Sequence, residues 1–320
     1  MRNSPKFLAF LIVVTLVGCW VAPVLAQAPL PIPQQPPQNA PLPVPEQPQV
    51  QQGAPLPASA ALPPAYPPAE LDRIVSPIAL YPDPLLAQVL TAATYYNEIP
   101  DAARWADQHH YLTGPALTAA MASDQVPWDP SVQALLPFPS VLDVMASDMP
   151  WTQEIGTAFL AQSNDVMDAV QRMRQSAVQY GYLRSGPPIA VRTGPYIEIL
   201  PVDPGYIVVP YYDPLIVFAP PRRGFVVAGA IRFGFGVTLG AAFTPWGWGT
   251  SRFVWNQHNI IINNAPWRRS WGNRMTYVHP YTARRYTELR PAEGHHVEER
   301  SPAEREAARS GRKYREEHGR

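Results

Sequence analysis

Two pairs of adjacent histidines are the tightest groups of metal-ligating side chains in this 320-residue sequence. His109 and His110 follow Asp107 in a predicted helix, and His295 and His296 lie in a charged stretch near the C-terminus. Neighbouring residues on a helix point about 100° apart and do not easily share one ion. The second pair lies in a segment that we expect to be solvated. The sequence therefore predicts no metal site, and nothing in it indicates a cofactor.

Motifs of nucleophilic and phosphate chemistry are absent from the sequence. It has no Gly-x-Ser-x-Gly elbow, no His-Glu-x-x-His motif and no phosphate-binding loop. Carboxylates are frequent between residues 70 and 180, and a pair of them is the requirement for glycan hydrolysis, yet no pair stands out. We predict no catalytic residue and expect a non-catalytic scaffold or binding protein. The alternative is a cell-wall glycan-active enzyme that uses paired carboxylates.

Two tryptophans close an internal repeat. Met-Ala-Ser-Asp followed by Pro-Trp occurs over residues 121–128 and again over 145–151, so the copies end at Trp128 and Trp151. We expect each copy to end one helix and begin the next, with the indole packed over the joint. The functional alternative is that exposed faces of these two rings stack on sugars.

Aromatic and basic residues alternate near residue 270. Trp267, Arg268 and Arg269 form the densest such group and are further candidate binding residues. In a cytoplasmic protein this pattern would favour nucleic acid, but an export signal argues against that partner. We therefore expect an envelope protein, a glycan or an anionic membrane surface as the partner.

The single cysteine, Cys19, ends a segment with the pattern of an export signal. Two basic residues precede an apolar run over residues 7–17, which leads into Gly18 and Cys19. The run is too short to span a bilayer as a mature helix. The pattern resembles the lipobox of bacterial lipoproteins and predicts lipid attachment at Cys19, whereas cleavage after Ala26 would remove this cysteine. Both alternatives place the protein in a Gram-negative envelope, either in the periplasm or anchored to a membrane as a lipoprotein.

Prolines and capping residues predict short helices after the signal. Asp83 and Asp129 each precede a proline and are suited to cap a helix that begins there. A further helix is predicted over residues 99–110. The longest candidate runs from Trp151 to about Tyr180 and would end at Gly181.

From residue 189 the pattern of apolar residues changes from the spacing typical of helices to that typical of strands. Predicted strands cover Ile189–Arg192, Tyr196–Leu200, Tyr206–Pro210, Leu215–Phe218 and Ile260–Ile262. The turn residues 202–205 predict a hairpin between the second and third strands. The Gly-rich stretch Phe225–Phe243 is expected to be a packed small-residue helix or a strand pair, because Arg232 disfavours a membrane-spanning helix.

These elements give an α+β fold, with a mainly helical acidic domain followed by a small antiparallel β unit, flanked by a disordered Pro-rich spacer and a polar C-terminal tail. The predicted segments are 1–26 (signal), 27–69 (Pro/Gln-rich spacer), 70–183 (helical domain), 184–222 (β unit), 223–290 (Gly/Trp/Arg-rich region) and 291–320 (charged tail). Net charge is unevenly divided. Residues 70–180 hold 13 acidic and 4 basic side chains, and residues 181–290 hold 4 acidic and 12 basic ones. The two parts should therefore attract each other, unless the basic part faces an anionic partner.

The segment Leu71–Leu90, together with residues 128–135, resembles the core motif of the bacterial domain-of-unknown-function family number thirty-three hundred. The resemblance covers about residues 71–218 and implies an exported protein with Pro/Gln-rich segments. It brings no established activity, cofactor or catalytic residue. Of the family's C-terminal histidine pattern, His279 is present and Ala283 replaces the second histidine, which weakens a metal hypothesis based on that pair.

Overall fold

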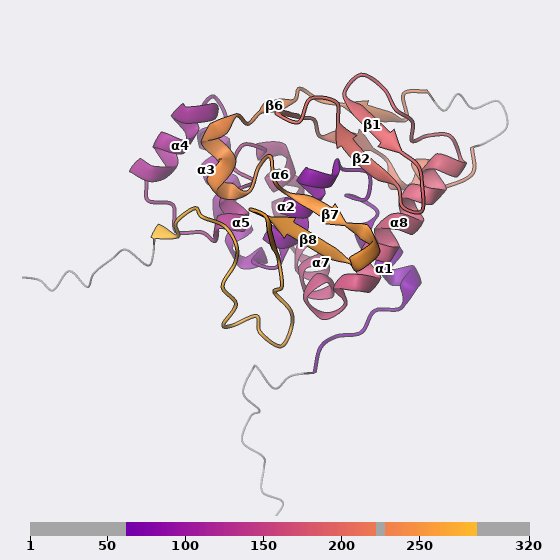
Figure 1. Cartoon of the computed structure of the whole chain (residues 1–320), viewed down its shortest axis with the longest axis horizontal. Coiled ribbons are helices and arrows are strands. Elements are labelled where there is room, and N and C mark those ends of the chain that lie inside the picture. The colour runs from indigo at the N-terminus through magenta and orange to yellow at the C-terminus, as the bar shows by residue number, and fades with distance from the viewer. Residues whose placement is uncertain (1–61, 222–227, 287–320) are drawn as a thin grey trace, which may run out of the picture. The chain divides into compact units, whose positions relative to one another are not determined.

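The computed structural model describes residues 62–221 and 228–286 of the chain. The predicted signal with Cys19, most of the Pro-rich spacer and the C-terminal tail with His295 and His296 lie outside the described residues. Helices come first along the described part, and small antiparallel sheets follow (Figure 1). This order confirms the predicted α+β class.

Proline begins almost every helix of the first half. Within the described residues, seven of the first eight α-helices have proline at their first or second position, where its missing N–H has no partner inside a helix anyway. The eight are α1 (Pro68–Val75), α2 (Asp83–Ala93), α3 (Ile99–Gln108), α4 (Gly114–Ser123), α5 (Pro130–Gln133), α6 (Pro139–Ser147), α7 (Met149–Ala161) and α8 (Ser163–Gln179). A 3-10 turn, η2 (Tyr96–Glu98), joins α2 to α3.

The predicted single helix from Trp151 to Tyr180 is wrong, because Gln162 divides it into α7 and α8. Gln162 has φ −141° and ψ 50°, outside the helical region. Its side-chain amide binds the backbone of Tyr66, with Oε1 accepting from the Tyr66 N–H at 2.7 Å. This long-range contact holds the break. Gly181, at φ +76°, follows α8 as predicted.

The two predicted aspartate caps have different outcomes. Asp129 caps α5, and its carboxylate accepts from the Ser131 N–H at 2.9 Å. The prediction that Asp83 caps a helix is wrong, because Pro82 occupies the N-cap position of α2 and Asp83 is its first helical residue. Its carboxylate turns inward and pairs with Arg174 at 2.6 Å.

Four small antiparallel sheets follow the helices in the part of the chain that the structure describes. Strands β1 (Ile189–Arg192) and β2 (Glu198–Pro201) pair, as do β3 (Tyr206–Ile207) with β6 (Val237–Thr238) and β4 (Pro210–Tyr212) with β5 (Ile231–Phe233). The fourth sheet holds β7 (Arg252–Val254), β8 (Asn259–Ile262) and β9 (Ala265–Pro266). Short helical turns α9 (Pro214–Val217), η3 (Ala241–Trp246) and η4 (Trp255–Gln257) connect them.

The predicted hairpin between the second and third strands is wrong, although its turn exists. Asp203 Oδ1 accepts from the Gly205 N–H at 2.9 Å, as a tight turn requires. However, β2 pairs back onto β1, and β3 pairs with β6. The predicted strand over residues 215–218 is also wrong. Asp213 caps a helical turn there by accepting from the Leu215 N–H at 2.9 Å.

The described part of the Gly-rich stretch forms strands. It contributes β5 and β6, and Gly236 lies against the ring of Tyr206, where an added Cβ would approach the ring carbon Cζ to 2.3 Å. The glycine therefore permits close ring-to-backbone packing. Across the ranges that the structure describes, no helix is both long enough and apolar enough to span a bilayer.

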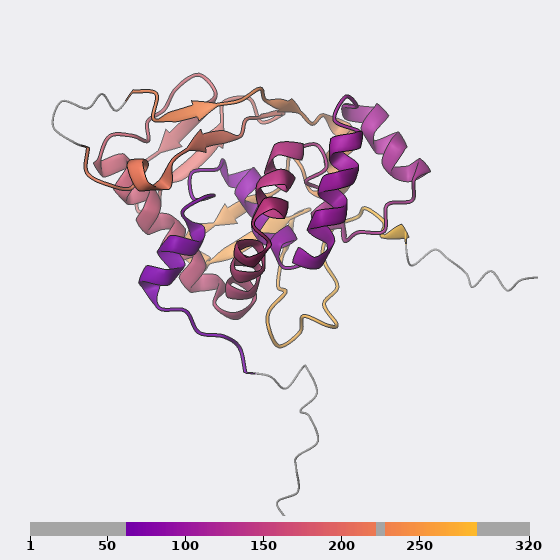
Figure 2. The same cartoon turned by 180° about the vertical axis from the view of Figure 1, so that it is seen from behind.

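A common hydrophobic core joins the acidic and basic parts of the chain. Its buried members are apolar residues of the helices, between Leu71 and Val170, and apolar residues of the following region, between Ile207 and Tyr281, with Trp248, Trp255 and Trp267 among them. Strands β7 and β8 lie over α2 and α7 in Figure 1, and the turned view of Figure 2 shows the helices in front of these strands. Apolar burial thus joins the two parts, with contacts between opposite charges added to it, such as Arg285 with Glu98.

Candidate functional site

The predicted binding residues Trp267, Arg268 and Arg269 lie together in the wall of a cavity of about 170 Å³. Residues at the start of α8, in β8 and in the turn before β8 also line it. We call this cavity the Trp267 pocket. The polar side chains that line it, besides the two arginines, are those of Ser163, Asn164, Gln257, His258, Asn259 and Ser270.

Local backbone conformation brings these residues together. Asn263 and Asn264, both at positive φ, turn β8 back into β9, and the Trp267 N–H then donates to the Ile260 carbonyl at 2.9 Å. The indole of Trp267 is stacked on Phe159 of α7, with 5.4 Å between ring centroids. The site is therefore assembled from segments about 100 residues apart.

Buried donors without partners distinguish the Trp267 pocket. Trp267 is only 6% exposed, and its indole N–H has no hydrogen-bond partner among the described residues. The buried Nε–H of Arg269 is likewise unpartnered. An unsatisfied buried donor costs about 1–3 kcal/mol. An acceptor oxygen that reached this N–H from the pocket would remove the cost at Trp267.

The two arginines have different environments. Arg269 donates to the carbonyl and hydroxyl of Thr94 at 2.7 and 2.8 Å, and its guanidinium lies over the ring of Tyr95 at 3.6 Å. Burial lowers the pKa of Arg269 from its ordinary value. Arg268 is exposed and forms no ion pair with a carboxylate that the structure describes. Its guanidinium is therefore available to a ligand.

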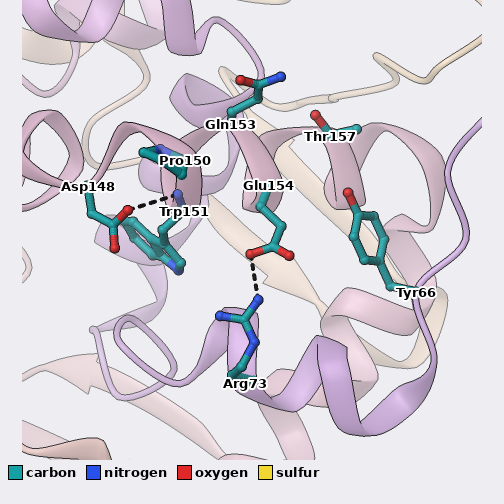
Figure 3. Close-up of a pocket in the computed structure, with 8 residues that line it drawn as sticks. All are labelled: Tyr66, Arg73, Asp148, Pro150, Trp151, Gln153, Glu154 and Thr157. Atoms are coloured by element: carbon teal, nitrogen blue, oxygen red, sulfur yellow. Dashed lines mark hydrogen bonds and ion pairs between the residues drawn. The ribbon is translucent and has the colours of Figure 1, made fainter.

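A second, more open pocket surrounds Trp151 (Figure 3). It measures about 490 Å³ and contains two carboxylates of the start of α7, Asp148 and Glu154. Glu154 pairs with Arg73 at 2.6 Å, and Asp148 accepts from the Trp151 N–H at 3.1 Å (Figure 3). Both carboxylates thus hold structural contacts.

Trp151 and Trp128 are buried, at 7% and 8% exposure. The Trp151 indole N–H donates to the Ile74 carbonyl at 2.8 Å, and Trp128 packs edge-on against Trp105. Their positions match packed helix joints and leave little ring surface for stacking on a sugar. Neither tryptophan lines the Trp267 pocket, and their part in binding stays a prediction.

Sequence reasoning missed the contact between two carboxylate-bearing residues, Glu98 and Asp129. Glu98 Oε2 accepts from the Asp129 backbone N–H at 2.5 Å, and Glu98 also pairs with Arg285. Asp129 Oδ1 accepts from the Ser131 hydroxyl at 2.6 Å, and Oδ2 lies 3.8 Å from His279 Nε2. Burial raises the pKa of Glu98 despite the charge of Arg285. The residues are far apart in sequence, so no local signal marks them.

The described histidine pair at the end of α3 makes helix contacts. The Nδ1 atoms of His109 and His110 lie 2.8 and 2.5 Å from the carbonyls of Trp105 and Asp107, respectively. The ring of His109 also stacks on Trp105 at 4.0 Å. Within residues 62–221 and 228–286, no three His, Cys, Asp or Glu side chains are grouped to hold a metal ion.

Comparison with known proteins gives one family match. The family described as "Protein of unknown function (DUF3300)" matches residues 67–286. A curated relative, "Uncharacterized protein YacH" of Escherichia coli (strain K12), is 34% identical over 230 residues, which is 58% of this chain. The chain spans 37% of the length of that relative. No solved structure matches the chain.

Proposed function

Because the chain belongs to the DUF3300 family of proteins of unknown function, we propose a function from its own residues: it is an exported, non-catalytic binding protein of the cell envelope, and the Trp267 pocket is its ligand site. The observation that carries the proposal is the buried indole N–H of Trp267, which has no partner among the described residues and belongs to the wall of a cavity rich in polar side chains. Buried donors are normally satisfied, so an unsatisfied one at a cavity supports a bound acceptor.

The chemistry of the wall supports a saccharide as the ligand. Amide, hydroxyl, imidazole and guanidinium groups surround the Trp267 pocket, and each of these forms hydrogen bonds with sugar hydroxyls. Its volume of about 170 Å³ is below the roughly 300–1,000 Å³ of pockets for drug-sized ligands. The pocket therefore suits one sugar unit of a glycan better than several consecutive sugar units.

The carboxylates support binding without catalysis. Glycoside hydrolysis needs one carboxylic acid and one free carboxylate on either side of the scissile bond. The Glu98 carboxylate accepts from the Asp129 backbone N–H and pairs with Arg285, the Asp129 carboxylate accepts from the Ser131 hydroxyl, and Glu154 is paired with Arg73. No carboxylate lines the Trp267 pocket among the residues that the structure describes.

A glycan-binding experiment with a product analysis tests the proposal. The whole chain is applied to immobilised envelope glycans, beside Asn164→Ala in the pocket and Asn97→Ala outside it. We expect Asn164→Ala alone to weaken binding and the glycans to keep their length in mass spectrometry. Release of shortened glycans would show an enzyme, and equal binding by all three proteins would place the ligand elsewhere.

The envelope location is tested at Cys19, which lies outside the described residues. If Cys19 carries acyl chains, Cys19→Ala should move from the membrane fraction to the soluble fraction and lose the lipid mass. A mature protein that begins at Gln27 in intact mass spectrometry would refute lipid attachment while leaving export intact.

A further inference from the structure

We infer that the ligand of the Trp267 pocket is an acidic sugar, whose carboxylate lies between Arg268 and the start of α8. The inference rests on the proposed binding function and specifies the class of saccharide. Three independent features support it: the charge of the pocket wall, the helix end that forms part of it and the unpartnered indole N–H of Trp267.

The wall of the Trp267 pocket is cationic. Arg268, Arg269 and His258 line it, and no Asp or Glu does so among its described residues. Two carboxylates of α8 adjoin the wall without lining it: Asp165, in the first turn of the helix, accepts from the Gln162 side-chain amide at 3.0 Å, and Asp168 lies 2.8 Å from His258 Nε2. Since the Arg269 guanidinium donates to the Thr94 carbonyl and hydroxyl, the guanidinium left free to bind a ligand is that of Arg268.

The start of α8 adds backbone donors. Ser163 and Asn164 are the first residues of this 17-residue helix, and both line the pocket. The first N–H groups of a helix have no partner within it, and the helix dipole favours an anion there. Gln162, at the N-cap position, makes no side-chain capping bond, because its amide is directed to Tyr66 and Asp165. Its side chain therefore does not occupy these donors.

The buried indole N–H of Trp267 is the third feature, and it points to a ligand independently of the helix end. Trp267 is more than nine-tenths buried and belongs to the same wall as Arg268 and the α8 start. The indole Nε1 itself has almost no accessible surface, so a sugar oxygen would accept from it only after a shift of the pocket wall, while the carboxylate binds Arg268. A flat membrane surface or a nucleic-acid backbone meets Arg268 at the surface and leaves the recessed donor unsatisfied. The Arg268 guanidinium and the Trp267 indole N–H together therefore favour a small acidic ligand.

Isothermal titration calorimetry on the whole chain tests this with glucuronate and glucose, which differ only at C6. We expect glucuronate to bind more tightly, and Arg268→Gln to weaken glucuronate binding about tenfold or more, as for the loss of a hydrogen bond to a charged group. Glucose binding should change little. Arg232→Gln, the same charge change at an exposed arginine of β5, is the matched control and should bind glucuronate like the wild type.

The outcomes separate this inference from the proposed function. Equal binding of glucose and glucuronate overturns the acidic ligand but leaves the binding function in place. Loss of glucuronate binding in both arginine variants shows attraction by overall charge and overturns the site. Binding of neither sugar, with phosphatidylglycerol vesicles captured in an Arg268-dependent manner, shows a lipid headgroup instead. Absence of all binding overturns both proposals.

Discussion

Asp83→Asn removes one charge of the most deeply buried ion pair in the described structure. Arg174 is 0% exposed, and its guanidinium lies 2.6 Å from Asp83 Oδ1 and 5.1 Å from the centroid of Trp255. The Trp255 indole N–H donates to Asp83 Oδ2 at 3.1 Å. Arg174 also donates to three backbone carbonyls, those of Ala79, Tyr81 and Ile197. This group of contacts joins α2, α8, β2 and the β7–β8 region.

The expected cost follows from the charge that is left behind. Asparagine keeps the size of Asp83 but leaves the Arg174 guanidinium buried without a counter-charge, which typically costs about 3–5 kcal/mol. For a domain of this size about 2–4 °C of melting temperature corresponds to each kcal/mol, so we expect a decrease of roughly 6–20 °C. The assay is urea unfolding followed by far-UV circular dichroism, with thermal melting beside it.

Asp72→Asn is the matched control. Asp72 pairs with Arg172, two residues before Arg174 on the same helix, at 2.7 Å but with both side chains partly exposed. Exposed pairs contribute about 0–1 kcal/mol, so this variant should be nearly as stable as the wild type. If Asp83→Asn also costs less than about 1 kcal/mol, the reasoning that this pair organises the core is refuted.

Three further predictions concern packing and titration. Gly156→Ala should destabilise the protein by about 1–3 kcal/mol or more in urea unfolding, because the added Cβ would lie 1.9 Å from a backbone carbonyl oxygen of α2; Gly186→Ala, with open space around it, should not. Trp151→Ala should cost about 3–5 kcal/mol, and loss of glycan binding at unchanged stability would instead support a role in binding. Glu98 should titrate above the ordinary 4.5 in carboxyl NMR, and Arg285→Gln should raise this pKa further. Because the folded state holds the proton of the Glu98 carboxyl more tightly than the unfolded chain does, the contribution of Glu98 to the free energy of unfolding falls as pH rises through its raised pKa. A Glu98 pKa at or below the ordinary value would contradict the effect of burial on this carboxyl.

Local signals account for what the sequence predicted of the fold. Proline in a first helical turn and glycine after a helix end act within a few residues, so the helix starts at Pro84 and Pro130, within one residue, and the end before Gly181 follow from neighbouring residues. The break at Gln162 does not, because it is held by Tyr66, nearly 100 residues earlier.

Strand partners depend on contacts that the sequence does not mark. Residues 202–205 form the turn that their types predict, yet the adjoining strand β3 pairs with β6, which follows about 30 residues later. Two-residue strands carry little periodicity, and their pairing is decided by packing against the shared core. The local pattern therefore located most of the strands, with the exception of residues 215–218, but gave the wrong partner for the third strand.

The candidate site likewise combines residues that a local pattern marks with residues that only the fold brings together. Trp267, Arg268 and Arg269 are adjacent, so their pattern was visible, whereas Asn164 and His258 reach the pocket through the fold. Arg174 had a usable signal that was overlooked. It lies at helical spacing between Val170 and Ala177, both buried, and an arginine in an apolar stripe indicates a buried counter-charge.

Two-dimensional ¹H–¹⁵N NMR of the tryptophan indole groups tests the central claim most directly. The chain has nine tryptophans, and the resonance of Trp267 is the one missing from the spectrum of Trp267→Phe. Titration with glucuronate should shift this resonance downfield, because its N–H gains an acceptor, while the indole resonances of Trp128 and Trp151 stay in place. A Trp267 resonance that does not move at saturating glucuronate, or the same shift with sodium chloride alone, would contradict a ligand site at the Trp267 pocket.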